Sequence, residues 1–147
     1  MPLASRIVSA GPYKLLDGGI SDSIPLKYSE YKGNAHNVVI LTQPEGYLKK
    51  PNSMIPAIRR VYRNYPNLVR TIERRHLIYN KQLEYIARCE SNGTALVIRP
   101  PHKLPVNHTT HNPDVLRETY AIGRRTGLLM IDQVKEFLGQ QQRVKHS

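Results

Sequence analysis

The chain has 147 residues, an ordinary length for one domain with its own hydrophobic core. Its 22 lysines and arginines against 11 acidic residues give a net charge of +11, which attracts polyanions such as nucleic acid or anionic lipid without selecting among them. The single cysteine, Cys89, excludes a disulfide framework, and no stretch is typical of a signal peptide or a membrane span. We therefore expect a cytoplasmic protein that at most lies peripherally on a membrane.

The first twenty residues predict a hairpin that ends in an acidic turn. Two short apolar segments, residues 6–9 and 13–16, flank a Gly-Pro turn signal at residues 11–12. This pattern predicts two short strands that place the Asp-Gly-Gly sequence of residues 17–19 after the second strand. Because Asp-Gly is a common turn sequence, these residues alone also fit a plain turn whose carboxylate satisfies backbone amides.

The rest of the chain predicts short strands that alternate with helices. The expected elements are a helix from Pro25 to about Lys32, a strand at 37–42, a helical segment at 53–65, a long helix from Pro66 to Gly93, a strand at 94–99, a loop at 100–111, and helices at 113–125 and 128–138. The continuous apolar run at 37–42 favours a strand that is buried on both faces, as in α/β sheets.

Apolar spacing also predicts which side of the helices faces inward. The long helix carries a stripe at intervals of three and four residues, formed by Val69, Ile72, His76, Tyr79, Leu83 and Ile86. We expect Gly127 to separate the last two helices, with Ile131, Val134 and Leu138 facing inward. The polar tail at 140–147 is expected to be frayed.

Several motifs between residues 9 and 100 resemble the bacterial patatin-like phospholipase family. They are the Gly11–Lys14 turn, Asp17-Gly18-Gly19, Ile24-Pro25, the apolar run 38–42, the segment Gln43–Pro51, Tyr65-Pro66, Arg75-His76, Tyr79-Asn80 and the segment 96–100. The resemblance implies an α/β fold. Residues 1–51 would be the C-terminal portion of a three-layer α/β/α catalytic domain, and residues 52–147 a mainly helical extension with one short strand.

The resemblance also implies a reaction. In that family the Asp of this turn completes a Ser-Asp dyad that hydrolyses lipid acyl esters, so Asp17 would be the catalytic base and Gly18 and Gly19 its active-site loop. The family's Gly-x-Ser-x-Gly elbow and its Gly-rich oxyanion loop are both absent, because none of the eight serines has the required flanking glycines. We therefore expect a truncated half-site, inactive alone, that needs no cofactor and relies on an upstream segment of the same enzyme for its serine.

Other candidate residues have plainer explanations. His76 lies on the apolar stripe, so we expect a packed ring bonded to backbone and not a catalytic group. The loop histidines His102, His108 and His111 lack Cys or acidic partners nearby, and we expect no metal site there. Asp22 is expected to brace the acidic loop or cap the next helix.

Basic residues suggest a second function class. Four arginines, Arg59, Arg63, Arg70 and Arg74, recur at spacings that would stack them along consecutive helices. They form either a solvated face or a contact surface for an anionic membrane. The alternative to a lipid hydrolase is therefore a non-enzymatic basic module that binds a polyanion. No specific nucleic-acid contact is expected, because Tyr62, Tyr65 and Tyr79 lie on the inward stripes.

Overall fold

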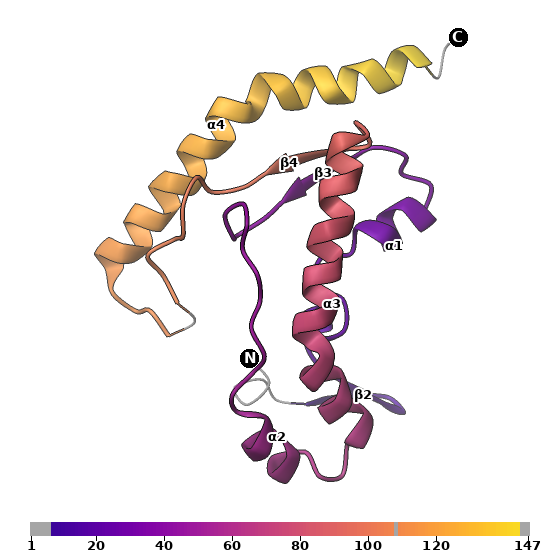
Figure 1. Cartoon of the computed structure of the whole chain (residues 1–147), viewed down its shortest axis with the longest axis vertical. Coiled ribbons are helices and arrows are strands. Elements are labelled where there is room, and N and C mark those ends of the chain that lie inside the picture. The colour runs from indigo at the N-terminus through magenta and orange to yellow at the C-terminus, as the bar shows by residue number, and fades with distance from the viewer. Residues whose placement is uncertain (1–6, 108, 145–147) are drawn as a thin grey trace. The chain divides into compact units, whose positions relative to one another are not determined.

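The computed structural model describes residues 7–107 and 109–144. Within these residues the chain is a mixed α/β structure, about half helical, with four α-helices and two two-stranded sheets (Figure 1). It divides into two compact units that are interleaved in sequence. Unit 1 comprises Met1–Pro25 and Leu48–Tyr85, and unit 2 comprises Leu26–Tyr47 and Ile86–Ser147. The expected domain boundary after residue 51 stays a prediction.

Unit 1 begins with the predicted hairpin. Strands β1 (Val8–Ala10) and β2 (Tyr13–Leu15) pair antiparallel. Gly11 has a φ of 58°, the positive value that a two-residue hairpin turn requires at its first position. A single 3-10 turn, η1 (Gly18–Ile20), follows β2. The hairpin prediction is confirmed.

The core of unit 1 forms where two helices meet the end of the acidic turn. Helix α2 (Ile55–Val61) and helix α3 (Pro66–Ser91) supply most of its side chains. The buried cluster consists of Ile20, Ile58, Tyr62, Val69 and Ile72. The long helix and its apolar stripe are confirmed, although His76 and Leu83 are only half-buried and Tyr65 is exposed.

Unit 2 is built around a pair of parallel strands. Strand β3 (Asn37–Ile40) pairs with β4 (Ala95–Ile98) in a single register, with Asn37 opposite Ala95. Parallel pairing requires a long crossover, and here residues 41–94 supply it. Helix α1 (Leu26–Tyr31) contacts β3 and ends before Gly33, whose φ of 93° is suited to glycine. The predictions for α1, β3 and β4 are confirmed.

The last helix differs from the expectation. Helix α4 (Pro113–Val144) is one continuous helix, so the predicted break at Gly127 is wrong. Of the tail expected to be frayed, residues 140–144 are helical and residues 145–147 lie outside the described residues. Helical glycine costs only about 1 kcal/mol relative to Ala, and the half-buried stripe continues across Gly127. That stripe comprises Val115, Thr119, Ile122, Thr126, Met130, Val134 and Phe137. Ile131 and Leu138 are exposed, contrary to the prediction.

Helix α4 packs within unit 2 on a narrow surface. It contacts β4, and its Phe137 ring forms a T-shaped pair with the ring of His36, with 5.6 Å between ring centroids. Asn112 caps its start by accepting a hydrogen bond from the Asp114 amide. No helix in the described ranges is both long and apolar enough to cross a membrane.

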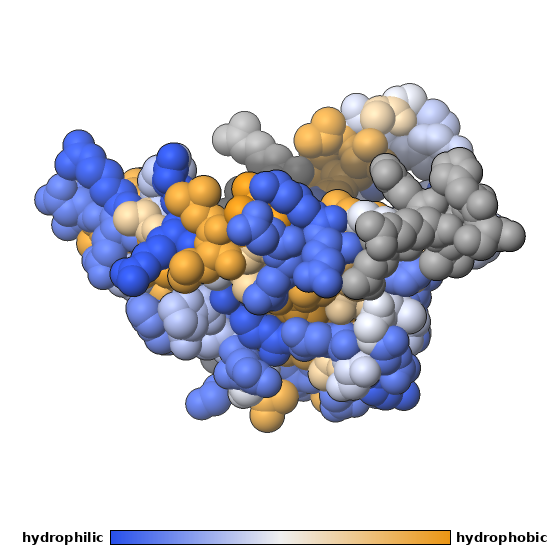
Figure 2. Space-filling view, turned by 90° about the horizontal axis from the view of Figure 1, so that it is seen from above, coloured by the Kyte–Doolittle hydropathy of each residue, from blue (hydrophilic) through white to orange (hydrophobic). Residues whose placement is uncertain are grey.

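Both small sheets leave apolar side chains at the surface. All six residues of β1 and β2 are exposed, among them Val8 and Tyr13. In β3 only Val39 is buried and Ile40 is 72% exposed, so the expected burial on both faces is wrong for this chain. Figure 2 shows one face on which hydrophobic residues lie between hydrophilic ones.

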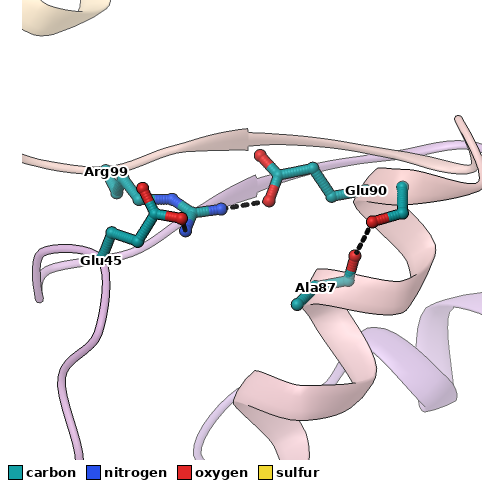
Figure 3. A network of polar contacts seen from close by, with 5 residues as sticks. Glu45, Ala87, Glu90 and Arg99 are labelled. Carbon is teal, nitrogen blue, oxygen red and sulfur yellow. Dashed lines mark hydrogen bonds and ion pairs between the residues drawn. The ribbon is translucent and has the colours of Figure 1, made fainter.

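An arginine holds the end of β4 in unit 2. Arg99, just after the strand, pairs with Glu90 of α3, and its Nη1 lies 3.8 Å from Glu45 Oε1 (Figure 3). The Arg99 side chain is 21% exposed, so its charge is largely removed from water. Two carboxylates therefore compensate one partly buried guanidinium.

Candidate functional site

The candidate site centres on the acidic turn of unit 1. Asp17 is exposed and occupies the cap position of η1, where its Oδ1 accepts a hydrogen bond from the Gly19 amide at 2.9 Å. Among the described residues, its Oδ2 accepts no hydrogen bond. One carboxylate oxygen is thus fixed by the backbone and the other remains available to an incoming donor.

Helix α3 braces this turn from a distant part of the sequence. Arg75 donates from Nε to the Gly19 carbonyl oxygen at 2.9 Å, and Gln82 donates from Nε2 to Asp22 Oδ1. Ser23 adds a local bond to the same Gly19 carbonyl at 2.6 Å. The prediction that Asp22 braces the loop is confirmed. Side chains of α3 therefore hold the turn that carries the Asp17 carboxylate, and substitution of Arg75 or Gln82 would disturb that turn.

The segment around Lys49 is attached to the same helix. The Lys49 amide donates to Asn80 Oδ1 at 2.8 Å, and Asn80 Nδ2 donates back to the Lys49 carbonyl at 3.1 Å. The Lys49 ammonium lies 4.8 Å from the ring centroid of Tyr79. Burial, together with the nearby charge of Arg75, lowers the pKa of Lys49 below its ordinary value of 10.5.

The histidines do not join the acidic turn in a recorded contact. His76 has a buried Nδ1 without a hydrogen-bond partner, so the expected bond from this nitrogen to the backbone is not present. His102 and His111 are exposed, whereas His108 lies outside the described residues. Within the described ranges, no group of three or more His, Cys, Asp or Glu residues is placed to hold a metal ion.

The four candidate arginines are exposed but not equivalent. Arg59 of α2 forms an ion pair with Glu73 of α3 at 2.6 Å, which joins the two helices and partly neutralises the arginine. Arg63, Arg70 and Arg74 make no ion pair with any carboxylate in the described part of the chain. The structure thus assigns Arg59 a structural contact and leaves three free cations on unit 1.

Four residues around the turn were not predicted as site residues: Lys49, Arg75, Asn80 and Gln82. Their contacts join positions 31 to 60 residues apart, so the spacing of residues along the sequence does not predict these contacts. The one available signal was that Lys49, Arg75 and Asn80 lie in motifs that resemble the phospholipase family.

Residues 65–139 match DUF6363, a domain of unknown function. The match covers half of the chain. The chain belongs to this family. The DUF6363 region contains α3, β4 and most of α4, including Arg75, Asn80 and Gln82, whereas the acidic turn and Lys49 precede it. No curated protein and no solved structure matches the chain.

Proposed function

We propose that the chain is the C-terminal portion of a patatin-like lipid acyl hydrolase and supplies Asp17 as the base of a Ser-Asp dyad. The serine would come from an upstream segment of the same enzyme. The observation that carries this proposal is the state of the Asp17 carboxylate. It is exposed, one oxygen is held by Gly19, and the turn is braced from α3.

Such a carboxylate has the properties that the reaction requires. Asp17 accepts the proton of the serine hydroxyl as the serine oxygen attacks the ester carbonyl carbon, and it returns this proton to the departing alcohol. Water then attacks the acyl-serine, with Asp17 again taking a proton and returning it to the serine. The hydrogen bond from the Gly19 amide limits the rotation of this carboxylate.

The exposed sheets support the three-layer α/β/α fold as part of the proposal. Parallel strands occur almost only in sheets that are covered on both faces, whereas β3 and β4 form a lone pair with Ile40 exposed. The apolar side chains of β1 and β2 are uncovered as well. Additional strands and helices from an upstream segment would cover these surfaces.

The decisive test joins this chain to an upstream segment that carries a Gly-x-Ser-x-Gly motif in the same reading frame. In the joined protein, Asp17→Asn should lower kcat for p-nitrophenyl ester hydrolysis by about three to four orders of magnitude, because dyad members act as a unit. Asp132→Asn, at an exposed position of α4, is the matched control. A near-normal rate in the Asp17 variant, with an unchanged far-UV spectrum, would reduce Asp17 to a turn residue.

The same proposal also predicts the activity of this chain without the upstream segment. Without a nucleophile and an oxyanion hole, the 147-residue protein should release p-nitrophenol no faster than buffer. Turnover that is abolished by a serine-directed phosphonate would contradict the idea of a half-site.

A second candidate, a basic module that binds anionic surfaces, is favoured by the three unpaired arginines. Reversal of Arg63, Arg70 and Arg74 to Glu should abolish binding to phosphatidylglycerol vesicles, because each nearby cation contributes on the order of 1 kcal/mol. Reversal of Arg124, Arg125 and Lys103 provides a control with the same change in net charge. Equal losses would mean that net charge alone is at work. Saturable binding to an oligonucleotide at physiological salt, without vesicle binding, would favour nucleic acid as the polyanion.

A further inference from the structure

The backbone of Gly19 connects the Asp17 carboxylate to helix α3. Its amide donates to Asp17 Oδ1 at 2.9 Å, and its carbonyl oxygen accepts from Arg75 Nε at 2.9 Å and from Ser23 Oγ at 2.6 Å. A carbonyl oxygen has two lone pairs, so these two donors occupy both of them. Gly19 is therefore held on both sides, and one of its anchors is a side chain that lies 56 residues further along the chain.

The carboxylate and the guanidinium border the same small space beside Gly19. A Cβ at position 19 would lie 3.3 Å from Asp17 Oδ1 and 3.9 Å from Arg75 Nη2. Arg75 is thus close to the carboxylate, while its hydrogen bond from Nε goes to the backbone of the turn. This geometry lets Arg75 set the position of Asp17 through the Gly19 backbone.

The turn depends on α3 because its neighbours along the chain give it little support. All six residues of β1 and β2 are exposed, and η1 is only three residues long. Burial of Ile20 fixes the end of η1, and two side chains of α3 hold the residues on either side of it. These side chains, Arg75 and Gln82, are seven residues apart, or about two helical turns, and so lie on the same side of α3.

We propose that Arg75 is the positioning residue of Asp17, and that α3 of the DUF6363 region serves as a brace for the acidic turn. Arg75 and Gln82 lie within the matched residues 65–139, whereas the turn precedes them. Arg75 holds the Gly19 carbonyl, and Gly19 in turn limits where the carboxylate lies. A displacement of about 1 Å in a catalytic group costs about a hundredfold in rate. The catalytic consequence of this brace rests on the proposed dyad, whereas the brace itself does not.

Three substitutions at position 75 separate the hydrogen bond from the charge. In Arg75→Gln the amide nitrogen is as many bonds from Cα as the arginine Nε, so it can donate to Gly19 without a charge. Arg75→Lys keeps the charge but places a carbon at that position. Arg75→Met removes both the donor and the charge. Lys81→Met, at an exposed position of the same helix, is the matched control for loss of one positive charge.

The brace is tested in the 147-residue chain by hydrogen exchange of the Gly19 amide, followed by NMR. Arg75→Met should accelerate exchange about tenfold, because a hydrogen bond from a charged donor is lost. Arg75→Gln should exchange nearly as slowly as the wild type, Arg75→Lys should resemble Arg75→Met, and Lys81→Met should have no effect. Unchanged exchange in Arg75→Met, or exchange as fast in Arg75→Gln as in Arg75→Met, would overturn the brace.

The positioning role is tested by kinetics in the protein joined to its upstream segment. Arg75→Met should lower kcat for p-nitrophenyl ester hydrolysis about ten- to a hundredfold at an unchanged KM, and Arg75→Gln should restore most of the rate. Adding Arg75→Met to Asp17→Asn should cause no further loss, because Arg75 acts through Asp17. A full further loss in the double variant, or restoration by Arg75→Lys instead of Arg75→Gln, would overturn the positioning role. A near-normal rate in Asp17→Asn would remove the dyad, and the exchange experiment would still decide the brace.

Discussion

The two units of the chain hold their irregular segments in different ways. In unit 1 the acidic turn and the Lys49 segment are attached to α3 by side chains of Arg75, Gln82 and Asn80. In unit 2 the backbone ladder of β3 and β4 provides the framework. A ladder is insensitive to most side-chain changes, whereas a segment held by one amide or one guanidinium is not. The candidate site thus lies where single substitutions have the most positional effect.

Core truncation should have the largest effect, and it should be similar in both units. Ile58 of unit 1 is 1% exposed and Ile86 of unit 2 is 2% exposed. Each Ile→Ala change should lower the free energy of unfolding by about 2–5 kcal/mol, measured by urea denaturation. The control Ile40→Ala, at an exposed strand position, should change it by about 0.5 kcal/mol or less. A cost at Ile40 equal to the other two would show that this strand is covered in solution.

Loss of the Asn80 amide should rank second and should act locally. Asn80→Ala leaves the partly buried amide and carbonyl of Lys49 without partners, at a cost of about 2 kcal/mol. Hydrogen exchange of the Lys49 amide should accelerate together with the loss of stability. Asn64→Ala, at an exposed position, should change neither quantity. Unchanged exchange in Asn80→Ala would mean that other contacts hold the segment.

The arginine of unit 2 should matter less than the amide of unit 1. Arg99→Met removes the partner of Glu90 and Glu45 and should lower the free energy of unfolding by about 1 kcal/mol. Arg117→Met breaks an exposed pair with Asp114 and should cost about 0.5 kcal/mol or less. If the two variants lose the same stability, partial burial of Arg99 contributes nothing.

The smallest effect is a dependence of stability on pH. The pKa of Lys49 is lower in the folded chain than its ordinary value of 10.5, so in this window the unfolded chain binds more protons. The contribution of Lys49 to stability therefore rises with pH between the folded pKa and 10.5. The free energies of unfolding of the wild type and of Lys49→Met are to be compared from neutral pH upward. As the pH rises, the wild type should gain stability relative to the variant. A difference that does not vary with pH would contradict the lowered pKa.

Local sequence signals predicted most of the elements. Pro66 and Gly93 bracket α3 and the spacing of its apolar residues gives its buried side, because both effects act within a few turns. Gly127 misled the prediction of α4, since a glycine weakens a helix without ending it when the packed stripe continues. Burial of β3 was overestimated because a run of apolar residues shows that a strand favours burial. It does not show whether other elements are present to pack on both faces of that strand.

The site was predictable only in its local part. The display of Asp17 on a tight turn follows from the hairpin and the glycines beside it. The position of Arg75 against Gly19 depends on a fold that brings residues 56 positions apart together, and no periodicity encodes that contact. Its placement needed three-dimensional structure.

The pairing of β3 with β4 also has a kinetic consequence. These strands are neighbours in space but are separated by residues 41–94, which include all of α2 and all of α3. The entropy of closing so long a loop must be overcome before the ladder stabilises the chain, so the strand pair should form late. Formation of α3 shortens the effective loop because it fixes the path between the strands. Circular permutants that open the chain between Pro51 and Ser53 interrupt the loop between these strands. Comparing their folding rates with their free energies of unfolding would show whether loop closure or the stability of a unit sets the rate of strand pairing.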